Sequence, residues 1–394
     1  MKQKVCVPNY WEQFNCIASK CEETCCAGWY IAIDEAAYKK YKKVKDPQMK
    51  KRLDKELVAR KGSVSRDCVA KIKLKNNRCA FLAKDNLCDI YRNLGENYLS
   101  ETCKVYPRNV NGVYGKLELS LTLSCPEAAR IILKTPSITF SEEEDRFHLP
   151  VVGGKLEGQS GKLKHFEQGI LGIRKQLIAI LQNREVSFAT RWQCLEEAMK
   201  TLDRMKKKQD IKALAEWLQQ DLVKNHLKTQ KNDEDTTISF EKAAFEKAFH
   251  ALVKMRTDKK WSSQSYESCY QMMVSGLSEG AAEEVKWSDD KFEQGLKLFN
   301  DQLEGPWRIL FENYFVHYIY ERLVPMDQKT PLESFEVMAR YLKMIILHLC
   351  GMLVERPELE ESLVIQLIQG MTRVFDHDEQ TMEQFKKLCL NSNN

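Results

Sequence analysis

The second half of the chain shows a continuous helical pattern of apolar residues. From residue 163 onward, apolar side chains recur three and four positions apart, the spacing that places them on one face of an α-helix. Pro306, Pro331 and Pro357 stand at or near the starts of predicted helices, where the missing backbone N–H is tolerated. The predicted helices cover residues 166–181, 192–205, 214–227, 240–255, 266–277, 290–303, 307–323, 332–354, 358–375 and 381–390. Residues 163–394 are therefore expected to form an all-α domain, with a polar loop at 228–237.

Residues 1–135 show a mixed pattern of shorter elements. Polar and apolar residues partly alternate over residues 29–33 and 113–123, as they do in half-buried strands. Residues 36–60 combine Lys, Glu and Leu at helical spacing, and their charges are interpreted as the solvated face of a helix. The expected fold is mostly α, with a small mixed α+β domain followed by a larger all-α domain.

Residues 136–162 have the composition of a connector. They carry Pro136, Pro150, an acidic run at 142–145, and glycines at 153, 154, 158 and 161. A glycine-rich loop before a helix can also cradle a phosphate. This spacing matches neither standard phosphate-binding fingerprint, and no long buried strand precedes it. We therefore predict a linker at 136–162 between the two domains.

Charge and hydropathy limit the partners of the protein. Its 61 basic and 56 acidic residues give a net charge of only +5, which does not indicate a protein that coats nucleic acid or a membrane surface. The first residues lack the apolar core of a secretory signal, and the longest apolar stretch is far shorter than the roughly 20 residues of a membrane-spanning helix. We expect a cytoplasmic protein with no nucleic-acid partner and no membrane segment, of unknown oligomeric state.

The distribution of the cysteines gives information that charge and hydropathy do not. Ten of the fourteen lie before residue 126, and clustered thiols in a reducing compartment bind metal or do chemistry more often than they form disulfides. Thiolates select soft centres, namely zinc, copper(I) or iron–sulfur clusters. Zinc sites made of four cysteines usually show two C-x2-C pairs, and none occurs here, so an iron–sulfur cluster is favoured and zinc stays open as the alternative.

The thiols of this region stand in short, distinctive motifs. They read Cys21-Glu-Glu-Thr-Cys-Cys-Ala-Gly-Trp29, Cys79-Ala-Phe-Leu, Cys88-Asp-Ile-Tyr91, Cys103-Lys-Val-Tyr-Pro-Arg108 and Ser124-Cys-Pro-Glu127. Over residues 9–133 the sequence resembles the flagellin lysine N-methylase family. The steps around Cys79, Cys88 and Cys103 also resemble the broader family of zinc-or-iron-chelating cysteine domains. The run from Phe311 to Phe315 is similar to a Glu-Asn-Tyr run of the first family.

The resemblance implies transfer of a methyl group from S-adenosylmethionine to lysine side chains of flagellin, by an enzyme that carries an iron–sulfur cluster. The family's cysteine motif falls on six residues, with Cys16 and Cys125 as lesser candidates: Cys21, Cys25, Cys26, Cys79, Cys88 and Cys103. One four-iron four-sulfur cluster takes four thiolates, so two of the six would not be ligands. Neighbouring side chains point apart in regular structure, which predicts that Cys25 and Cys26 do not both bind.

The usual signatures of a methyl-donor site are missing from the sequence. No glycine-rich turn follows a strand with an acidic residue about 20 positions later. The C-x3-C-x2-C motif of radical enzymes is interrupted, because Gly28 stands where the third cysteine would be. A catalytic cluster and a structural cluster therefore both remain open.

Methylation of lysine also requires a group that removes a proton, because the lysine ammonium has an ordinary pKa of about 10.4. Aromatic residues at helical spacing between Trp307 and Tyr318 could surround such a cation, although a plain core stripe is the alternative. Glu312 and Tyr314 are the predicted polar residues near the reaction. Arg108 could pair with a cofactor carboxylate or form a structural ion pair. The alternative function is a non-catalytic metal-binding or redox module whose helical domain docks a partner.

Overall fold

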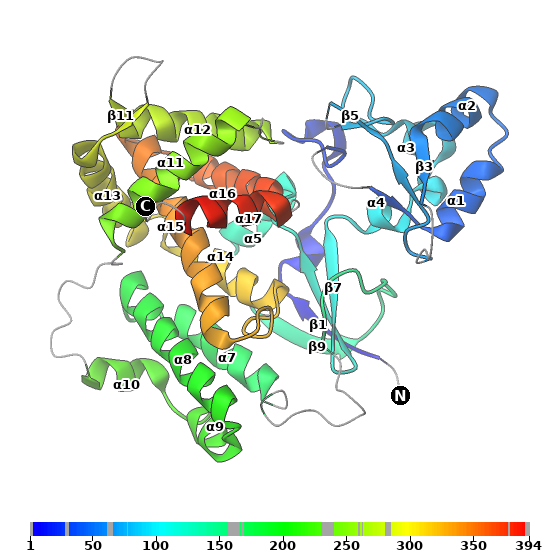
Figure 1. Cartoon of the computed structure of the whole chain (residues 1–394). Coiled ribbons are helices and arrows are strands. Elements are labelled where there is room, and N and C mark those ends of the chain that lie inside the picture. Colours follow the sequence, from blue (N-terminus) through cyan, green and yellow to red (C-terminus); the bar gives the residue numbers. More distant parts are fainter. Residues whose placement is uncertain are drawn as a thin grey trace.

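The computed structural model describes residues 3–27, 31–60, 66–76, 78–156, 166, 169–229, 240–258, 261, 263–279, 285–376 and 379–390. Figure 1 shows helices on one side of the molecule, a small lobe on the other, and a sheet beside both. Gly28 and most of the predicted loop at 228–237 lie outside the described residues. The mostly α fold class that the apolar pattern predicts is confirmed.

The described residues between Cys21 and Val105 form a lobe with its own core, called here the cysteine lobe. Its helices begin at polar caps: Asp34 and Asp46 accept hydrogen bonds from the backbone N–H groups three residues ahead, and Ser100 does the same. Ile33, Leu53 and Phe81 lie at the centre of the core. The lobe contains α1 (Glu35–Lys42), α2 (Pro47–Glu56), α3 (Asp89–Leu94), α4 (Glu101–Val105), the sheet β2 (Ala32–Ile33)–β4 (Ala70–Ile72)–β3 (Leu57–Ala59), and the hairpin β5 (Leu74–Lys75)–β6 (Arg78–Cys79).

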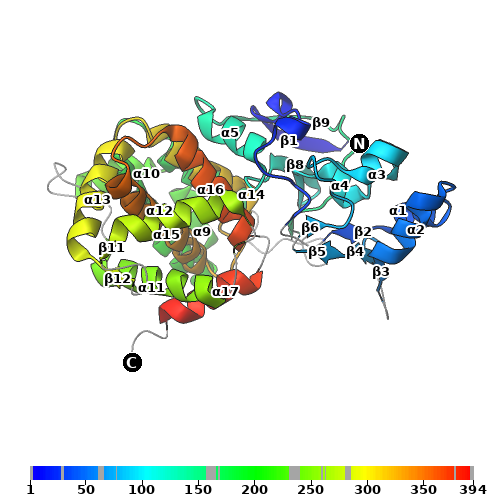
Figure 2. The same ribbon diagram turned by 90° about the horizontal axis from the view of Figure 1, so that it is seen from above.

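A five-stranded sheet lies between the cysteine lobe and the helices (Figure 2). Its order is β10 (Lys155–Leu156), β7 (Arg108–Val113), β8 (Lys116–Leu121), β1 (Lys4–Pro8) and β9 (Phe140–Glu144). Strands β7 and β8 form a hairpin whose turn residues, Tyr114 and Gly115, have φ angles of 47° and 83°, as the tight turns of hairpins require. Strand β1 pairs parallel with β8 and antiparallel with β9. The sheet therefore joins the first residues of the chain to residues beyond 135.

The predicted linker at 136–162 is only partly a connector. Residues 140–144 and 155–156 form the outermost strands β9 and β10 of the five-stranded sheet. The sheet shares one hydrophobic core with the helices, so Val5, Val110 and Leu119 belong to the same buried cluster as the helical residues that follow. In the structure, the boundary between hydrophobic cores separates the cysteine lobe from the rest of the chain. It does not lie between residues 135 and 163.

One central helix, α15 (Pro331–Glu355), packs against several of the remaining helices. Helices α12 (Gln264–Leu277) and α13 (Asp289–Leu303) lie against it so closely that a Cβ atom on Gly276 would come 1.9 Å from the carbonyl oxygen of Gly351. The length and composition of α15 would allow it to cross a membrane, but 72% of its apolar window is buried inside the protein. The others are α5 (Pro126–Lys134), α7 (Ile170–Leu181), α8 (Phe188–Lys208), α9 (Ile211–Trp217), α10 (Leu222–Thr229), α11 (Lys242–Asp258), α14 (Arg308–Glu321), α16 (Glu361–Phe375) and α17 (Glu379–Leu390).

His348 in α15 is fully buried and hydrogen-bonded. Its Nδ1 lies 2.7 Å from the carbonyl oxygen of Met344 and its Nε2 lies 3.0 Å from the hydroxyl of Tyr266. Nδ1 must donate to the carbonyl, so Nε2 accepts from Tyr266 and the ring is neutral. Burial lowers the pKa of His348 to about 4.

We expect this buried ring to make the protein less stable in acid. Between pH 6.5 and 4 the unfolded chain binds a proton at His348 that the folded chain does not, so stability falls as the pH falls, by about 3 kcal/mol in total. Urea unfolding at pH 7 and at pH 4.5 should show a smaller acid loss in His348→Gln than in the wild type. The exposed His148, replaced in His148→Gln, is the control. Equal acid losses in wild type and His348→Gln would contradict this assignment.

Candidate functional site

Four motif cysteines share the core of the cysteine lobe: Cys79 is buried in it, and Cys26, Cys88 and Cys103 are partly buried against it. The backbone N–H of Cys79 donates to the carbonyl oxygen of Cys26 at 2.7 Å, which joins the first two motifs. A β-bridge between Leu82 and Cys88 brings in the third motif. Burial is the main cause that raises the pKa of Cys103, and the charges of Cys88 and Cys79 raise it further. The thiols of the set are therefore close enough to interact electrostatically.

Backbone N–H groups point at several of these sulfur atoms. Cys88 stands at the start of α3, where the N–H groups of Ile90 and Tyr91 lower the pKa of its thiol against the larger effect of burial. The N–H of Phe81 donates to the Sγ of Cys79 at 3.4 Å. Burial nevertheless raises the pKa of Cys79 to about 11 and that of Cys103 to about 12. Without a positive centre between them, these two thiols stay protonated at neutral pH.

Cys25 and Cys21 differ from the other four motif cysteines. Cys25 is an exposed residue, and its Sγ lies 3.9 Å from the Sγ of Cys26. The hydrogen bond between the two thiols lowers the pKa of Cys25 to about 7, and the charge of Arg373 lowers it as well. The same hydrogen bond and burial raise the pKa of Cys26. Cys21 lies toward Cys125, whose pKa is raised by burial and then by the charge of Cys21. Of the six predicted residues, five therefore face a common region and Cys21 stands at its edge.

The donor set suits a soft metal centre by its chemistry, since it consists of thiols in an apolar surrounding. No group of three or more His, Cys, Asp or Glu side chains in the described ranges is arranged so that it could hold a metal ion. A single tetrahedral zinc would need four sulfur atoms about 2.3 Å from one point. A cubane cluster binds each thiolate at a different iron atom and so accepts sulfur atoms that stand further apart. The donor chemistry is that of a soft metal centre, either a zinc ion or an iron–sulfur cluster.

A buried ion pair connects the loop that contains Cys25 and Cys26 to the helical part of the molecule. Arg373 of α16 donates to the carbonyl oxygens of Thr24 and Ala27, both at 2.6 Å, and lies 3.4 Å from the carboxylate of Glu23. Ser263 and Gln369 also donate to Glu23, at 2.8 and 3.0 Å. The two carbonyl contacts flank the thiol pair, so the position of these sulfur atoms depends on α16.

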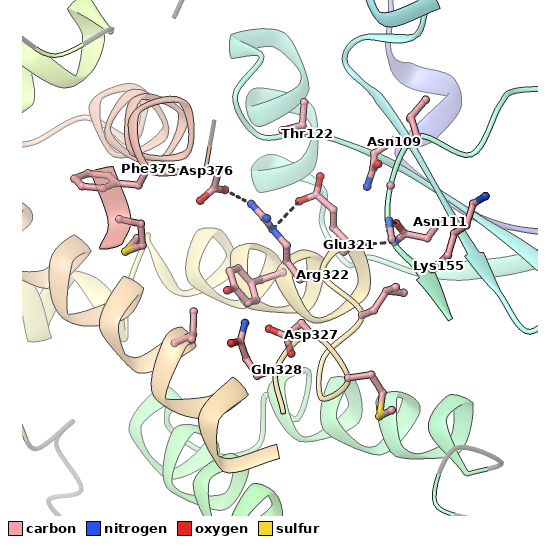
Figure 3. Close-up of a pocket in the computed structure, with 18 of the residues that line it drawn as sticks. Asn109, Asn111, Thr122, Lys155, Glu321, Arg322, Asp327, Gln328, Phe375 and Asp376 are labelled. Atoms are coloured by element: carbon pink, nitrogen blue, oxygen red, sulfur yellow. Dashed lines mark hydrogen bonds and ion pairs between the residues drawn. The ribbon is translucent and has the colours of Figure 1, made fainter. Parts of the chain in front are cut away.

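A polar cleft of about 1030 Å³ adjoins the cysteine lobe. Thr102 and Val105 of α4 line it on one side, and between them in the sequence lies Cys103. The opposite walls come from the C-terminal end of α14, from α15 and from the end of α16, as Figure 3 shows. The short helix α4 therefore contributes residues both to the cleft and to the thiol set.

Acidic and basic side chains in equal number line the cleft, together with the rings of Tyr318 and Tyr341. Arg322 lies between Glu321 and Asp376 in Figure 3, forms an ion pair with Asp376, and has its Nε 4.0 Å from Glu321. The hydroxyl of Tyr341 donates to Asp376, and its ring centre lies 5.6 Å from that of Tyr318. Aromatic faces attract ammonium and sulfonium groups, and nearby carboxylates add to this attraction.

Two glycines of the predicted linker also line the cleft. Gly154 donates its N–H to the Oδ1 of Asn111 at 2.8 Å, and a Cβ atom on Gly153 would come 2.1 Å from that same oxygen. Glycine is therefore required where the chain passes the asparagines of β7. The Gly-Gly pair is the feature of the sequence that marks this part of the cleft. Its pairing with a strand 40 residues earlier cannot be inferred from the local sequence.

The structure places the predicted catalytic and cofactor residues in different surroundings. Arg108 lines the cleft, and its guanidinium stands over the rings of Trp11 and Phe14 at 5.8 and 5.4 Å. Tyr314 lies inside the core next to Tyr318, which does line the cleft, with ring centres 6.3 Å apart. Burial raises the pKa of Tyr314 well above its ordinary value.

Glu312 lies in the core and outside the cleft. It is fully buried and paired with two guanidinium groups, those of Arg184 at 2.7 Å and Arg191 at 3.0 Å. Arg191 is fully buried as well. These contacts indicate a structural role, and the carboxylate that α14 presents to the cleft is Glu321, nine residues later.

Fold and site together define a mostly helical protein with a cysteine-rich lobe and a polar cleft beside it. Residues 174–394 match the family model of the FliB lysine N-methylase C-terminal domain. The chain belongs to the FliB lysine N-methylase family. Membership supports methyltransferase activity on lysine.

Similar proteins carry flagellar and methylase names. The chain is 31% identical over 140 residues to the flagellar biosynthetic protein FliU of Salmonella muenchen, an alignment that covers 36% of this chain and 83% of that protein. It is 32% identical over 129 residues to the lysine-N-methylases of Salmonella typhimurium and Salmonella choleraesuis. Each of these alignments covers 33% of this chain and only 32% of the methylase. No solved structure matches the chain.

Proposed function

We propose that the protein transfers a methyl group from S-adenosylmethionine to lysine side chains of a flagellar protein, flagellin in the first place. Membership of the lysine N-methylase family carries this proposal. The cleft supports it, because Tyr318, Tyr341 and the carboxylates around them suit both a lysine ammonium and a sulfonium. The FliU name supports a flagellar substrate. A cytoplasmic site of action fits thiols that must stay reduced.

A four-iron four-sulfur cluster in the cysteine lobe is the second part of the proposal. Cys26, Cys79, Cys88 and Cys103 would hold it, because these four share one apolar core. When bound, the cluster would supply a redox-active iron centre and would stabilise the fold of the lobe. Cys25 would then lie outside the ligand set, as an exposed residue next to Cys26. Arg108 remains our candidate for the carboxylate of the donor, since it reaches the cleft wall.

A direct assay tests the activity. Anaerobically purified protein is incubated with S-adenosylmethionine and flagellin, and the flagellin is digested and examined by mass spectrometry. We expect methylene-sized mass increases on lysines, and saturable binding of S-adenosylmethionine in calorimetry. Omission of the donor is the control. Neither binding nor mass increase would contradict the proposal and would favour a non-catalytic metal-binding module with a docking domain.

Metal analysis tests the cluster independently of activity. We expect about four iron and four acid-labile sulfide per chain and a brown colour. Zinc without sulfide would instead make the protein a zinc-stabilised methyltransferase, because zinc is colourless and binds no sulfide in such sites.

A further inference from the structure

A row of three polar side chains leads from the cleft into the core. Glu321, the last residue of α14, lines the cleft. One turn earlier on the same helix, His317 places its Nε2 3.4 Å from the Oε2 of Glu321. On the other side of the ring, Nδ1 lies 2.9 Å from the hydroxyl of Tyr10, which follows β1. Tyr10 and His317 are both fully buried.

The contacts determine where the protons of this row lie. Burial raises the pKa of Tyr10 well above its ordinary value, so its hydroxyl keeps its proton and can donate to Nδ1. With Nδ1 as the acceptor, the N–H of the ring lies on Nε2, which faces the carboxylate of Glu321. The other tautomer would aim a lone pair at a carboxylate, which is repulsive.

The contact between His317 and Glu321 is longer than a hydrogen bond. In the described part of the chain, the buried Nε2 of His317 has no hydrogen-bond partner. Catalytic hydrogen bonds are often long without substrate and shorten when it binds. A small movement of Glu321 toward His317 would satisfy this nitrogen.

Other carboxylates of the cleft have different partners. Asp376 shares the guanidinium of Arg322 with Glu321 and also accepts a hydrogen bond from Tyr341. Asp327 accepts a hydrogen bond from Ser334 at 2.6 Å, and burial raises its pKa. Glu321 is the carboxylate with a buried imidazole behind it, and its backbone carbonyl is fixed to β7 by the amide of Asn111 at 2.8 Å.

We propose that Glu321 is the general base that removes a proton from the target lysine, and that His317 and Tyr10 are positioning residues that orient its carboxylate. This inference rests on the proposed methyl transfer. The Glu321 carboxylate accepts one proton from the lysine ammonium. The freed amine forms the N–C bond with the methyl group, the C–S bond breaks, and its electron pair leaves on sulfur as a neutral thioether. Glu321 then releases its proton to water in the cleft.

The first test compares Glu321→Gln with the wild type. Glutamine keeps the size of the side chain but cannot take the proton, so kcat should fall about 100-fold while KM and the affinity for S-adenosylmethionine stay unchanged. Glu321→Asp keeps the carboxylate and should recover part of the rate. Glu336→Gln, an exposed residue of α15 outside the cleft, is the matched control and should leave the rate unchanged.

A pH profile gives a readout that a structural role would not produce. Without its base, the enzyme depends on lysine that water has already deprotonated, so the Glu321→Gln rate should rise about tenfold per pH unit between pH 7 and 9. The wild-type rate should rise less steeply. The phenols near Glu321 stay protonated in this range because burial raises their pKa, and Arg322 stays charged. The groups that face Glu321 are His317, Arg322, Tyr10, Tyr314 and Tyr318, and Asp376 lies on the other side of Arg322.

The positioning residues have their own expected result. Tyr10→Phe removes the donor that fixes the tautomer of His317, and kcat should fall about tenfold with KM unchanged. A Glu321→Gln enzyme with the wild-type rate, or one whose loss lies in KM or donor affinity, would overturn this inference. A wild-type enzyme without methyl transfer would overturn the proposed function instead.

Discussion

Replacing Glu312 by alanine is expected to lower the free energy of unfolding by about 3–5 kcal/mol, while methyl transfer per folded molecule stays close to that of the wild type. The carboxylate is fully buried and lies 3.0 Å from the guanidinium of Arg191, which is also fully buried. Without Glu312 this positive charge stays in the core with no opposite charge at that position. Burial already lowers the pKa of Arg191, which indicates how unfavourable the site is for a charge.

Urea unfolding measures the effect, and the methylation assay on the folded fraction separates stability from chemistry. Removing both charges in Glu312→Leu with Arg191→Leu should restore part of the stability, because an apolar pair leaves no buried charge behind. Glu336→Gln serves as the exposed control. If the Glu312→Ala protein has normal stability but no activity, Glu312 has a role in the reaction, as the sequence predicts.

Replacing Cys79 by serine is expected to remove most of the iron and sulfide, to abolish methyl transfer, and to destabilise the cysteine lobe. Cys79 is the buried member of the thiol set, and its backbone N–H donates a hydrogen bond to the carbonyl oxygen of Cys26. Serine oxygen is a hard, weak ligand for iron. Because the bound centre contributes to folding, its loss should also increase proteolysis of the lobe.

Two other thiols show whether the effect belongs to the ligand set. Cys25→Ser should retain iron and sulfide, because Cys25 is an exposed residue and stands outside the core of the lobe. Cys68→Ser removes a thiol of the same lobe whose Sγ lies 3.7 Å from the carbonyl oxygen of Ala70, and it should also keep the metal. Loss of iron in Cys25→Ser with full retention in Cys79→Ser would contradict the proposed ligands.

The helical half could be predicted from the sequence because its evidence is local. Apolar residues three and four apart indicate α15 and α16 directly, since each helix buries the face that this spacing defines. The predicted helix at 214–227 is two helices, α9 and α10, separated by a short turn. Strands β9 and β10 were missed because their place depends on pairing with β1 and β7, which lie far away in the sequence.

The site was only partly predictable for the same reason. Cysteine spacing indicated a thiol site, but the four that share a core are selected by contacts between distant loops. Glu312 and Glu321 could not be distinguished in the sequence, because α14 is buried from Leu310 to Tyr320 and has no polar face that marks the cleft. The cleft itself is lined by residues of α4, β7, β10, α14, α15, α16 and α17, and no short motif describes it.

The ion pair between Glu23 and Arg373 has a consequence for the order of events during synthesis. These residues are 350 positions apart, so the loop with Cys25 and Cys26 leaves the ribosome long before α16 exists to hold it. Tyr10 similarly waits for His317, 307 positions later. The amino-terminal thiols therefore pass most of translation without their final supports. If the lobe holds the proposed metal centre, the contacts of its Cys25–Cys26 loop with α16 form only after nearly the whole chain has been synthesised.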